Sequence, residues 1–354
     1  MSDRTGTSTQ NPLVVVKTKP LNAEAPLSAL REQITPTERF YVRNNFTVPD
    51  LAPEDWRLLI DGAVDKQVTL TLRELQALPS RTFSATMECA GNGRTAFAPL
   101  PEGEPWNLGA VSTALWRGVP VCQVLQLAGL TDAVVEVLFE GADKGMREGL
   151  DAEIHFARSL QRSKALEPDT LLVYEFNGAP LPANHGGPVR LLVPDWYGMA
   201  SVKWVTHITA LEQAFTGYFQ SARYVLEEPG SNTTKPVREM HVRALTTSPI
   251  QGELLAYGPY IITGVAWSGA GPIKSVEVSV QPEGGWHRAT LLGESTPHTW
   301  RQWQFQWEPP RPGRYVVRAR ATDEQGNTQP DIAPWNRLGY MNNAIQYVIF
   351  DVGE

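Results

Sequence analysis

Near the end of its first quarter the chain carries the run Thr86-Met87-Glu88-Cys89-Ala90-Gly91-Asn92-Gly93-Arg94. The run holds one of only two cysteines and continues into small residues and an arginine. Glycines permit positive φ angles and a close approach of the backbone to a ligand, and an arginine five residues after a thiol favours the thiolate. A thiolate suits a soft or high-valent metal better than calcium or magnesium. A lone cysteine is nevertheless more often a small buried side chain, so the spacing alone favours a structural cysteine.

The run MECAGNGR resembles the cofactor-cysteine motif of the sulfite oxidase family, molybdopterin enzymes that include the eukaryotic assimilatory nitrate reductases. In that family the cysteine sulfur is a direct molybdenum ligand. The resemblance therefore implies that Cys89 is the metal ligand and that molybdenum–molybdopterin is the cofactor. Further similar motifs follow in the family's order from about Phe40 to the C-terminus. The implied fold class is α+β: a mixed α/β molybdopterin-binding domain of the sulfite oxidase fold, then an immunoglobulin-like β-sandwich.

Length and composition indicate a folded protein of two domains. A chain of 354 residues exceeds one ordinary core, and 42% hydrophobic with 19% charged residues is typical of folded soluble proteins. The net charge of −7 argues against nucleic acid and membrane surfaces as partners, so an anionic substrate would need a local arginine cluster. No apolar run reaches the length of a membrane span, and no secretory signal is visible at the start. We therefore expect a cytoplasmic protein, or a periplasmic one if a signal has been trimmed.

Three segments are expected along the chain. Residues 1–36 would be an N-terminal arm, disordered over about its first 12 residues and proline-punctuated rather than packed from there on. Residues 37–230 would form the catalytic domain. A linker rich in Gly, Ser, Asn and Thr follows from Pro229 to Pro236, and residues 236–354 would form the sandwich.

Local patterns predict individual elements. Trp56–Gly62 and Leu171–Phe176 are expected as strands, Thr71–Leu78 as a short helix capped by Thr71, and Val119–Ala128 as a helix with Cys122 in the core. Both cysteines are expected to be reduced. Beyond the linker, short alternating runs separated by turns predict a β-sandwich. These runs are Ile261–Trp267, Ile273–Val280, Trp300–Trp307, Arg314–Ala321 and Ala344–Val352.

The segment Arg39-Phe40-Tyr41-Val42-Arg43-Asn44-Asn45-Phe46 is similar to a family F-x-V-R-N segment near the pocket. On the residues alone it is a short strand with a solvated arginine. The resemblance implies that Arg43 binds the anionic substrate and that Phe40 and Asn45 contact the cofactor. Many relatives carry His at the place of Asn45, so that contact is expected to differ here.

A second cofactor segment is implied further along. The order His185-Gly-Gly-Pro-Val-Arg190, with Lys203 thirteen residues later, is similar to the family's pterin-binding segment. Taken alone, these residues indicate a histidine whose hydrogen bonds are satisfied within the protein and two cations at the surface. Arg and Lys together nevertheless suit a phosphate. Tyr224 matches a pocket tyrosine and Trp106 a tryptophan near the substrate. Without the resemblance, a tyrosine or tryptophan in a loop is interpreted as a structural residue that packs over the hydrophobic core.

The last motif, Ala333 to Asn343, contains a departure from the family pattern. Sulfite oxidases have an arginine directly before a glycine here, reaching into the substrate pocket, whereas this chain has Leu338 before Gly339 and places Arg337 one residue earlier. In extended chain that shift turns a side chain to the opposite face. Either the loop is re-routed so that Arg337 points inward, or the pocket has lost one cation. The loop from Pro99 to Pro105 also lacks the lysines of many sulfite-active members.

The resemblance implies oxygen-atom transfer at molybdenum, with sulfite oxidised to sulfate and electrons passed to an external acceptor, a cytochrome or oxygen. Arg43, Arg94 and Arg337 would hold the oxyanion, and Arg94 has a second possible role in holding the Cys89 loop. We expect no heme or flavin in the chain, and a homodimer formed through the sandwich. Two alternatives stay open: a family member acting on another sulfur compound or nitrate, and a non-catalytic binding protein in which Cys89 is only buried.

Overall fold

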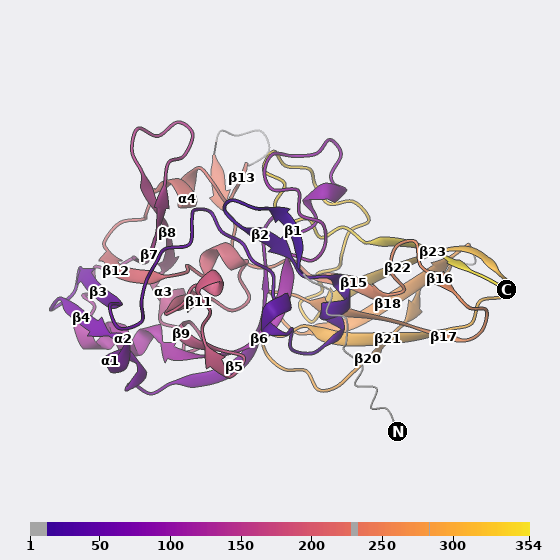
Figure 1. Ribbon diagram of the computed structural model, residues 1–354, viewed down its shortest axis with the longest axis horizontal. Helices are drawn as coiled ribbons and strands as arrows, with labels where there is room; N and C mark the ends of the chain where they lie inside the picture. Colours follow the sequence, from indigo (N-terminus) through magenta and orange to yellow (C-terminus); the bar gives the residue numbers. More distant parts are fainter. Residues whose placement is uncertain (1–12, 228–232, 283) are drawn as a thin grey trace, which may run out of the picture.

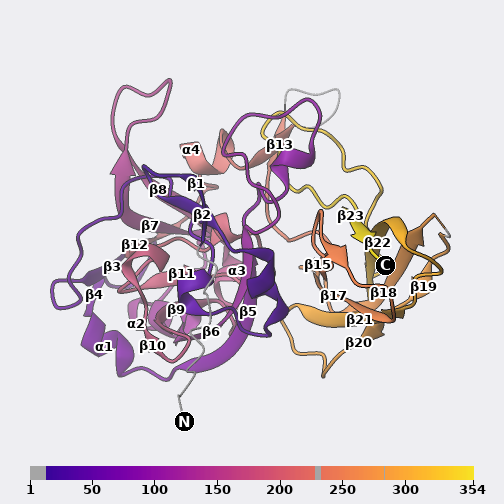
Figure 2. The same ribbon diagram turned by 45° about the vertical axis from the view of Figure 1, so that its right-hand side comes forward.

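The computed structural model describes residues 13–227, 233–282 and 284–354. Residues 1–12, which we expected to be disordered, and residues 229–232 of the expected linker lie outside these ranges. The described chain forms two lobes side by side, the first on the left of Figure 1 and the second on the right. Figure 2 shows the same arrangement after a turn of 45°.

Strands dominate the first lobe and, within residues 13–227, form two five-stranded sheets. One sheet is antiparallel throughout, in the order β10 (Ala179–Pro180), β9 (Leu171–Phe176), β6 (Val111–Pro120) and β5 (Arg81–Glu88), with β11 (Arg190–Leu192) also paired to β9. The other has the order β4 (Val68–Thr71), β3 (Arg57–Gly62), β12 (Val205–Leu211), β7 (Glu136–Gly145) and β8 (Ile154–Gln161). In this second sheet β12 and β3 run parallel and the remaining pairs are antiparallel.

The α-helices of the described residues are short: α1 (Leu72–Gln76), α2 (Val121–Ala128), α3 (Arg162–Ala165) and α4 (Tyr218–Ser221). At the predicted cap of α1, Thr71 Oγ1 accepts a hydrogen bond from the Glu74 amide at 3.2 Å, and the Glu74 carboxylate accepts one from the Thr71 amide at 2.8 Å. This reciprocal pair satisfies two free donors at the helix start. None of these helices is long and apolar enough to span a bilayer. The predicted helices and the α+β class are confirmed, with strands outweighing helices.

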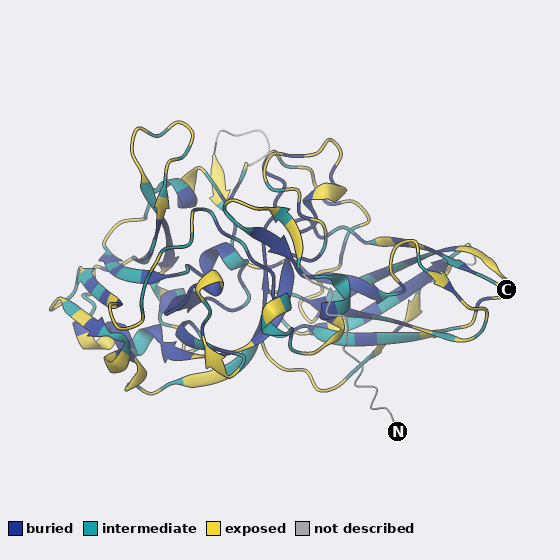
Figure 3. Ribbon diagram, viewed as in Figure 1, coloured by how far each residue is buried: buried dark blue, intermediate teal, exposed yellow. Residues whose placement is uncertain are grey.

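The core of the first lobe follows from the alternation of its strands. In β3, Leu58 and Ile60 are fully buried, whereas Arg57 is exposed, because successive side chains of a strand point to opposite faces. Trp56, just before the strand, is also buried, and its Nε1 donates to the carbonyl oxygen of Val205 at 2.8 Å. Figure 3 shows buried residues concentrated inside both lobes.

The second lobe is the predicted immunoglobulin-like sandwich. One sheet has the order β15 (Arg243–Ser248), β17 (Tyr260–Trp267), β21 (Arg301–Trp307) and β20 (Thr290–Leu291). The other has the order β16 (Leu254–Leu255), β23 (Tyr347–Val352), β22 (Gly313–Asp323), β18 (Ile273–Gln281) and β19 (His287–Arg288). The five predicted runs coincide with strands, although β23 begins three residues later than expected. Inward side chains such as Ile262, Val276, Trp303 and Phe350 are fully buried.

The N-terminal arm differs from the prediction. We expected Leu13 to Pro36 to be unpacked, but β1 (Val14–Lys17) pairs with β2 (Asn22–Glu24), and Ala29 and Leu30 are fully buried. Its prolines interrupt regular structure without preventing small and apolar side chains from packing. A smaller correction concerns Cys122, expected in the core, which is only half-buried on the surface side of α2; both cysteines are free.

Strand β5 belongs to the first lobe and is hydrogen-bonded to the second at Thr86, three residues before Cys89. The amide of Thr86 donates to the carbonyl oxygen of His298 at 2.8 Å, and the amide of Trp300 donates to Thr86 Oγ1 at 2.7 Å. The ring of His298 in turn lies 2.8 Å from the carboxylate of Asp195 and 3.4 Å from that of Asp169, both in the first lobe. The loop of residues 292–300 thus fastens the sandwich to the strand that leads to the cysteine.

Candidate active site

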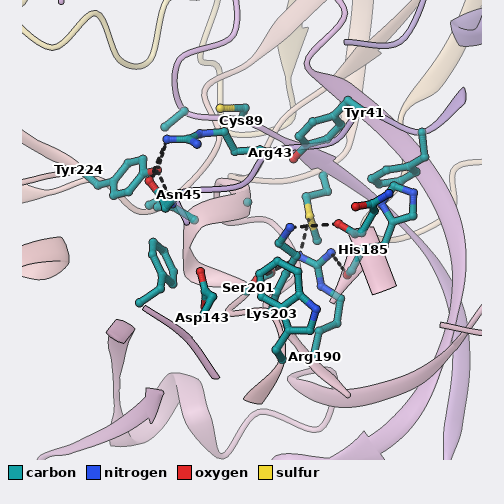
Figure 4. Close-up of a pocket in the computed structure, with 18 residues that line it drawn as sticks. Tyr41, Arg43, Asn45, Cys89, Asp143, His185, Arg190, Ser201, Lys203 and Tyr224 are labelled. Carbon is teal, nitrogen blue, oxygen red and sulfur yellow. Dashed lines mark hydrogen bonds between the residues drawn. The ribbon is translucent and has the colours of Figure 1, made fainter. Parts of the chain in front are cut away.

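A cavity lies in the first lobe, beside the end of β5. Figure 4 shows the side chains that line it. Its wall is made by segments that are far apart in the sequence and are brought together by the two sheets. Eight of the residues predicted from the sequence line it. They are Phe40, Arg43, Asn45, Cys89, His185, Arg190, Lys203 and Tyr224.

Cys89 stands where β5 ends and the small-residue loop begins. Its amide donates to the carbonyl oxygen of Ala110 at 2.8 Å, and its own carbonyl oxygen accepts from the Asn92 amide at 2.9 Å, so the backbone is fixed on both sides. Of the two glycines in the run, Gly93 adopts the positive φ that glycine permits, at 80°. Burial raises the pKa of the Cys89 thiol, and the nearby Arg43 and the Gly91 amide oppose this effect only in part. The buried thiol thus depends on a strong positive partner to become a thiolate.

At one end of the cavity Arg43, Asn45 and Tyr224 form a polar cluster near the thiol (Figure 4). Arg43 Nη2 donates to Asn45 Oδ1 at 2.8 Å and to the Tyr224 hydroxyl at 3.4 Å. Tyr224 holds a positive φ of 55°, a conformation that a bulky residue rarely adopts without a local reason. The cluster offers a guanidinium and a phenol to whatever lies next to Cys89.

The other end combines His185, Arg190 and Lys203. Arg190 donates to the carbonyl oxygens of His185 at 2.8 Å and Ser201 at 3.0 Å, which aligns its guanidinium along the wall. Burial, reinforced by the charges of Lys203 and Arg190, lowers the pKa of His185 to about 3. His185 is therefore neutral at physiological pH and presents a donor and an acceptor rather than a charge. Burial also lowers the pKa of Lys203, whose ammonium contacts Asn184 and Asn44.

The cations of this cavity form no direct ion pair with a carboxylate of the described residues, although Asp143 also lines the cavity and interacts electrostatically with Lys203. Among the described residues, no carboxylate forms an ion pair with Arg43, Arg190 or Lys203; their hydrogen bonds go to amide, carbonyl and hydroxyl groups. Uncompensated charges inside a protein are costly, so such an arrangement is typical of a site that receives an anion. This donor set suits a pterin that carries a phosphate group and two sulfurs, and the soft sulfur of Cys89 would hold its metal.

Comparison with known proteins agrees with this geometry. Residues 45–219 match the family described as oxidoreductase molybdopterin binding domain, and residues 234–351 match the Mo-co oxidoreductase dimerisation domain. Sulfite oxidase from Gallus gallus is 33% identical over 92% of the chain and 75% of its own length. This chain belongs to the sulfite oxidase family of molybdopterin oxidoreductases.

Two further similarities bear on what kind of family member it is. Mitochondrial sulfite oxidase from Mus musculus is 34% identical over 92% of the chain, which spans only 63% of that relative's length. The crystal structure of the sulfane dehydrogenase SoxCD from Paracoccus pantotrophus superposes with a TM-score of 0.81 at 27% identity, covering 99% of this chain and 90% of that one. The fold is thus shared across family members whose names refer to different sulfur substrates.

Arg94 does not line the cavity of this family member. Its Nε and Nη2 donate to the carbonyl oxygen of Leu338 at 3.1 and 2.9 Å, and its Nη1 donates to that of Glu104 at 2.5 Å. The position of a Gly91 Cβ atom would lie only 2.5 Å from the same guanidinium, so glycine is needed there for the arginine rather than for a ligand. The geometry favours the second of the two predicted roles, in which Arg94 holds the Cys89 loop.

Arg337 lies at the surface, which decides between the two alternatives for the shifted motif: an inward Arg337 or the loss of one cation from the pocket. Its side chain is 46% exposed and forms ion pairs with Glu227 at 2.8 Å and Glu102 at 3.3 Å. Leu338 is buried but contributes only its carbonyl oxygen to Arg94. The loop is therefore not re-routed, and Arg337 supplies no cation to the cavity. Trp106, expected near the substrate, is buried beneath the loop and does not line the cavity either.

Sequence reasoning missed several lining residues. Tyr41 and Ser201 belong to motifs that had been recognised and could have been found by extending them. Asp143 carries no local signal, because it sits in an irregular part of the β7–β8 pairing that displaces it into the cavity. Its Oδ1 is buried without a hydrogen-bond partner, and burial raises the pKa of this carboxyl group. Such an orphaned acceptor fits a ligand that donates N–H groups, as a pterin ring does.

Proposed function

We propose that this protein oxidises sulfite to sulfate by molybdenum-dependent oxygen-atom transfer and passes the electrons to a separate acceptor. The observation that carries the proposal is the set of unpaired cations and donors around the buried thiol of Cys89. A cavity of this kind suits a ligand with negative charge at both ends: a cofactor phosphate at one end and a small oxyanion at the other.

Molybdenum–molybdopterin, when bound, would supply the oxo transfer and the redox chemistry, which protein side chains cannot provide. The chain's residues have supporting tasks. Cys89 would provide the thiolate ligand. Arg190 and Lys203 would bind the phosphate, and neutral His185 and Asp143 would contact the polar ring.

Substrate binding is assigned to the Arg43 end of the cavity. Arg43 would donate to the oxyanion through charge-assisted hydrogen bonds, and the Tyr224 hydroxyl would add a donor without a charge. Both groups already lie within hydrogen-bonding distance of each other, at 3.4 Å, so the substrate would meet a prearranged pair.

A second candidate is oxidation of another sulfur compound, such as a sulfane. It is favoured by the outward position of Arg337, which leaves the cavity with fewer cations than the family motif would provide. The structural similarity to a sulfane dehydrogenase supports this alternative. Nitrate, the other alternative from the sequence, also stays open, because nitrate reductases are among the relatives, at 33% identity over 92% of this chain.

Further parts of the proposal concern partners. The match to a dimerisation domain supports a homodimer formed through the sandwich. A cytochrome is the acceptor we propose, with oxygen as the alternative, and the cytoplasm remains the predicted compartment. Light scattering of the purified protein and titration with oxidised cytochrome would test the first two, and cell fractionation the third.

The decisive experiment is sulfite-dependent reduction of ferricyanide by protein whose molybdenum content has been measured. Saturable turnover between micromolar and millimolar sulfite is the expected result. A molybdenum-replete sample that is silent with sulfite but oxidises a sulfane would shift the assignment to the second candidate. Protein that takes up no molybdenum in a host that makes the cofactor would contradict both.

A further inference from the structure

Arg147 lies on the loop between β7 and β8, the hairpin that projects at the upper left of Figure 1. Its guanidinium is placed between two aromatic rings, 4.5 Å from the centre of Phe46 and 5.4 Å from that of Phe219. Within the described residues no acidic group forms an ion pair with it, and its Nε is buried without a hydrogen-bond partner. Arg147 is thus a cation held in place without a direct ion pair among the described residues, although it interacts electrostatically with the carboxyl group of Asp143.

Arg147 is not among the residues that line the cavity, but its remaining contacts go to Asn45, which does line it. Its Nη2 donates to the carbonyl oxygen of Asn45 at 2.8 Å and lies 3.3 Å from the side-chain oxygen Asn45 Oδ1. The same Oδ1 accepts a hydrogen bond from Arg43 Nη2 at 2.8 Å, and the Tyr224 hydroxyl lies 3.3 Å away. Two guanidinium groups and a phenol therefore converge on one amide oxygen, that of Asn45, at the cavity wall. Figure 4 shows three of the four residues, Arg43, Asn45 and Tyr224.

An amide oxygen is a poor match for so many donors. Charge-assisted hydrogen bonds to an anionic oxygen are roughly twice as strong as those to a neutral one, and two like charges brought together favour an anion between them. An oxyanion that enters beside Cys89 meets Arg43 at this same point. The oxygen of Asn45 accordingly occupies the position in which a substrate oxygen would be best stabilised.

We propose that Arg147 is a second oxyanion-binding arginine, paired with Arg43 across Asn45, and that Asn45 Oδ1 holds the two guanidinium groups in place until a small sulfur oxyanion takes over their hydrogen bonds. This inference rests on the proposed function and specifies how its substrate is bound. It supplies from the β7–β8 hairpin the cation that the outward Arg337 does not provide. The contact with the carbonyl oxygen of Asn45 keeps Arg147 anchored during the exchange.

The competing explanation is structural: Arg147 would only fasten the hairpin to Phe46 and Phe219. Arg147→Met separates the two, because its unbranched apolar side chain retains the packing between the rings and removes the donor. Lys144→Gln is the matched control, since it removes one positive charge from the same hairpin, where Lys144 pairs with Glu153 at 3.4 Å on the surface.

For the molybdenum-loaded enzyme we expect Arg147→Met to raise the KM for sulfite roughly ten- to a hundredfold, with kcat changed far less. Lys144→Gln should change KM by less than about twofold. Asn45→Asp should raise KM at least as much as Arg147→Met, because a fixed carboxylate between the arginines competes with the substrate. An Arg147→Met KM equal to that of Lys144→Gln would overturn the proposal.

A second readout does not depend on turnover. Sulfate binding to the oxidised, molybdenum-loaded protein, measured by calorimetry, should weaken by a similar factor in Arg147→Met and not in Lys144→Gln. If the wild type binds sulfate and the binding weakens in Arg147→Met alone, but the wild type does not oxidise sulfite, the proposed substrate is wrong and the arginine pair stands. If the wild type oxidises sulfite and Arg147→Met neither raises KM nor weakens sulfate binding, the pair fails and the proposed function stands. A wild type that does not bind sulfate at all would also overturn the pair.

Discussion

The guanidinium of Arg243, at the start of β15 in the sandwich, lies 2.8 Å from the carboxylate of Glu88, the residue immediately before Cys89. Both side chains are almost completely buried, at 3% and 1% exposed. The carboxylate also accepts hydrogen bonds from Asn92 Nδ2 and from Trp267 Nε1, each at 2.9 Å. The second lobe thereby fixes the backbone from which the candidate metal ligand projects.

Removing one partner of this pair should be far more damaging than removing both. Arg243→Met leaves a buried carboxylate unpaired and should lower the free energy of unfolding by about 3–5 kcal/mol, whereas adding Glu88→Gln should restore much of the loss. Urea unfolding of both variants provides the measurement. Arg314→Met, which breaks an exposed pair with Asp351, is the control and should leave the midpoint unchanged. Equal stability of Arg243→Met and the wild type would show that the pair contributes nothing.

Two of the three arginines assigned to the oxyanion from the sequence, Arg43 and Arg337, should behave differently. Arg43→Met removes a donor from the cavity and should raise the KM for sulfite roughly ten- to a hundredfold. Arg337→Met breaks only surface ion pairs with Glu102 and Glu227, so KM should change by less than about fivefold. Steady-state kinetics on molybdenum-counted samples would decide. A large rise in KM for Arg337→Met would mean that the loop turns inward when substrate binds.

Cys89→Ser should separate cofactor chemistry from folding. The smaller, harder oxygen is a poor replacement for a soft thiolate, so we expect kcat to fall by roughly a hundredfold or more, since loss of even a partner of a metal ligand commonly costs 10–100-fold. The thermal midpoint of the cofactor-free protein should stay close to that of the wild type. X-ray absorption spectroscopy should show one sulfur fewer at molybdenum. Full activity would remove Cys89 from the site.

The contact of His298 with Asp195 and Asp169 should make stability depend on pH. Burial alone would lower the pKa of His298, but the two carboxylates outweigh it and raise the pKa above the unfolded value of about 6.5. The charged contact therefore contributes fully below about pH 6.5 and is lost as pH rises through the folded-state pKa. His298→Gln should be less stable by about 1–2 kcal/mol near pH 6, with the difference shrinking towards pH 9. A difference independent of pH in thermal unfolding would contradict this assignment.

What the sequence predicted well is what local motifs encode. Arg43 and Tyr224 are 181 residues apart and yet meet in the cavity, because each lies in a motif whose backbone course is set by its immediate neighbours and matches the family. The strands of the sandwich were found for the same reason, since alternation of apolar and polar residues is a local property. The N-terminal arm, by contrast, has apolar residues that prolines interrupt, so it carries no periodic signal.

The errors arose where a distant contact decides the direction of a side chain. Arg94 shares a motif with Cys89 but turns away from the cavity, because the carbonyl oxygen of Leu338, 244 residues later, accepts its hydrogen bonds. Arg337 faces solvent, where it pairs with two glutamates that are distant in the sequence, Glu102 and Glu227. Asp143 enters the cavity through a register irregularity that no spacing announces. Long-range pairing of this kind follows only once the fold is known.

The bonds from the sandwich to Thr86 and Glu88 also limit how freely the two lobes can be recombined. A chimera that joined this first lobe to a foreign sandwich would leave the carboxylate of Glu88 inside the interface without Arg243 or Trp267, at the position next to the thiol. Such a hybrid would need a positively charged side chain and a hydrogen-bond donor at the same buried position before it could bind the cofactor. The two lobes therefore have to be exchanged together. The buried ion pair between them, and not the sequence of the linker, limits which lobes can be combined.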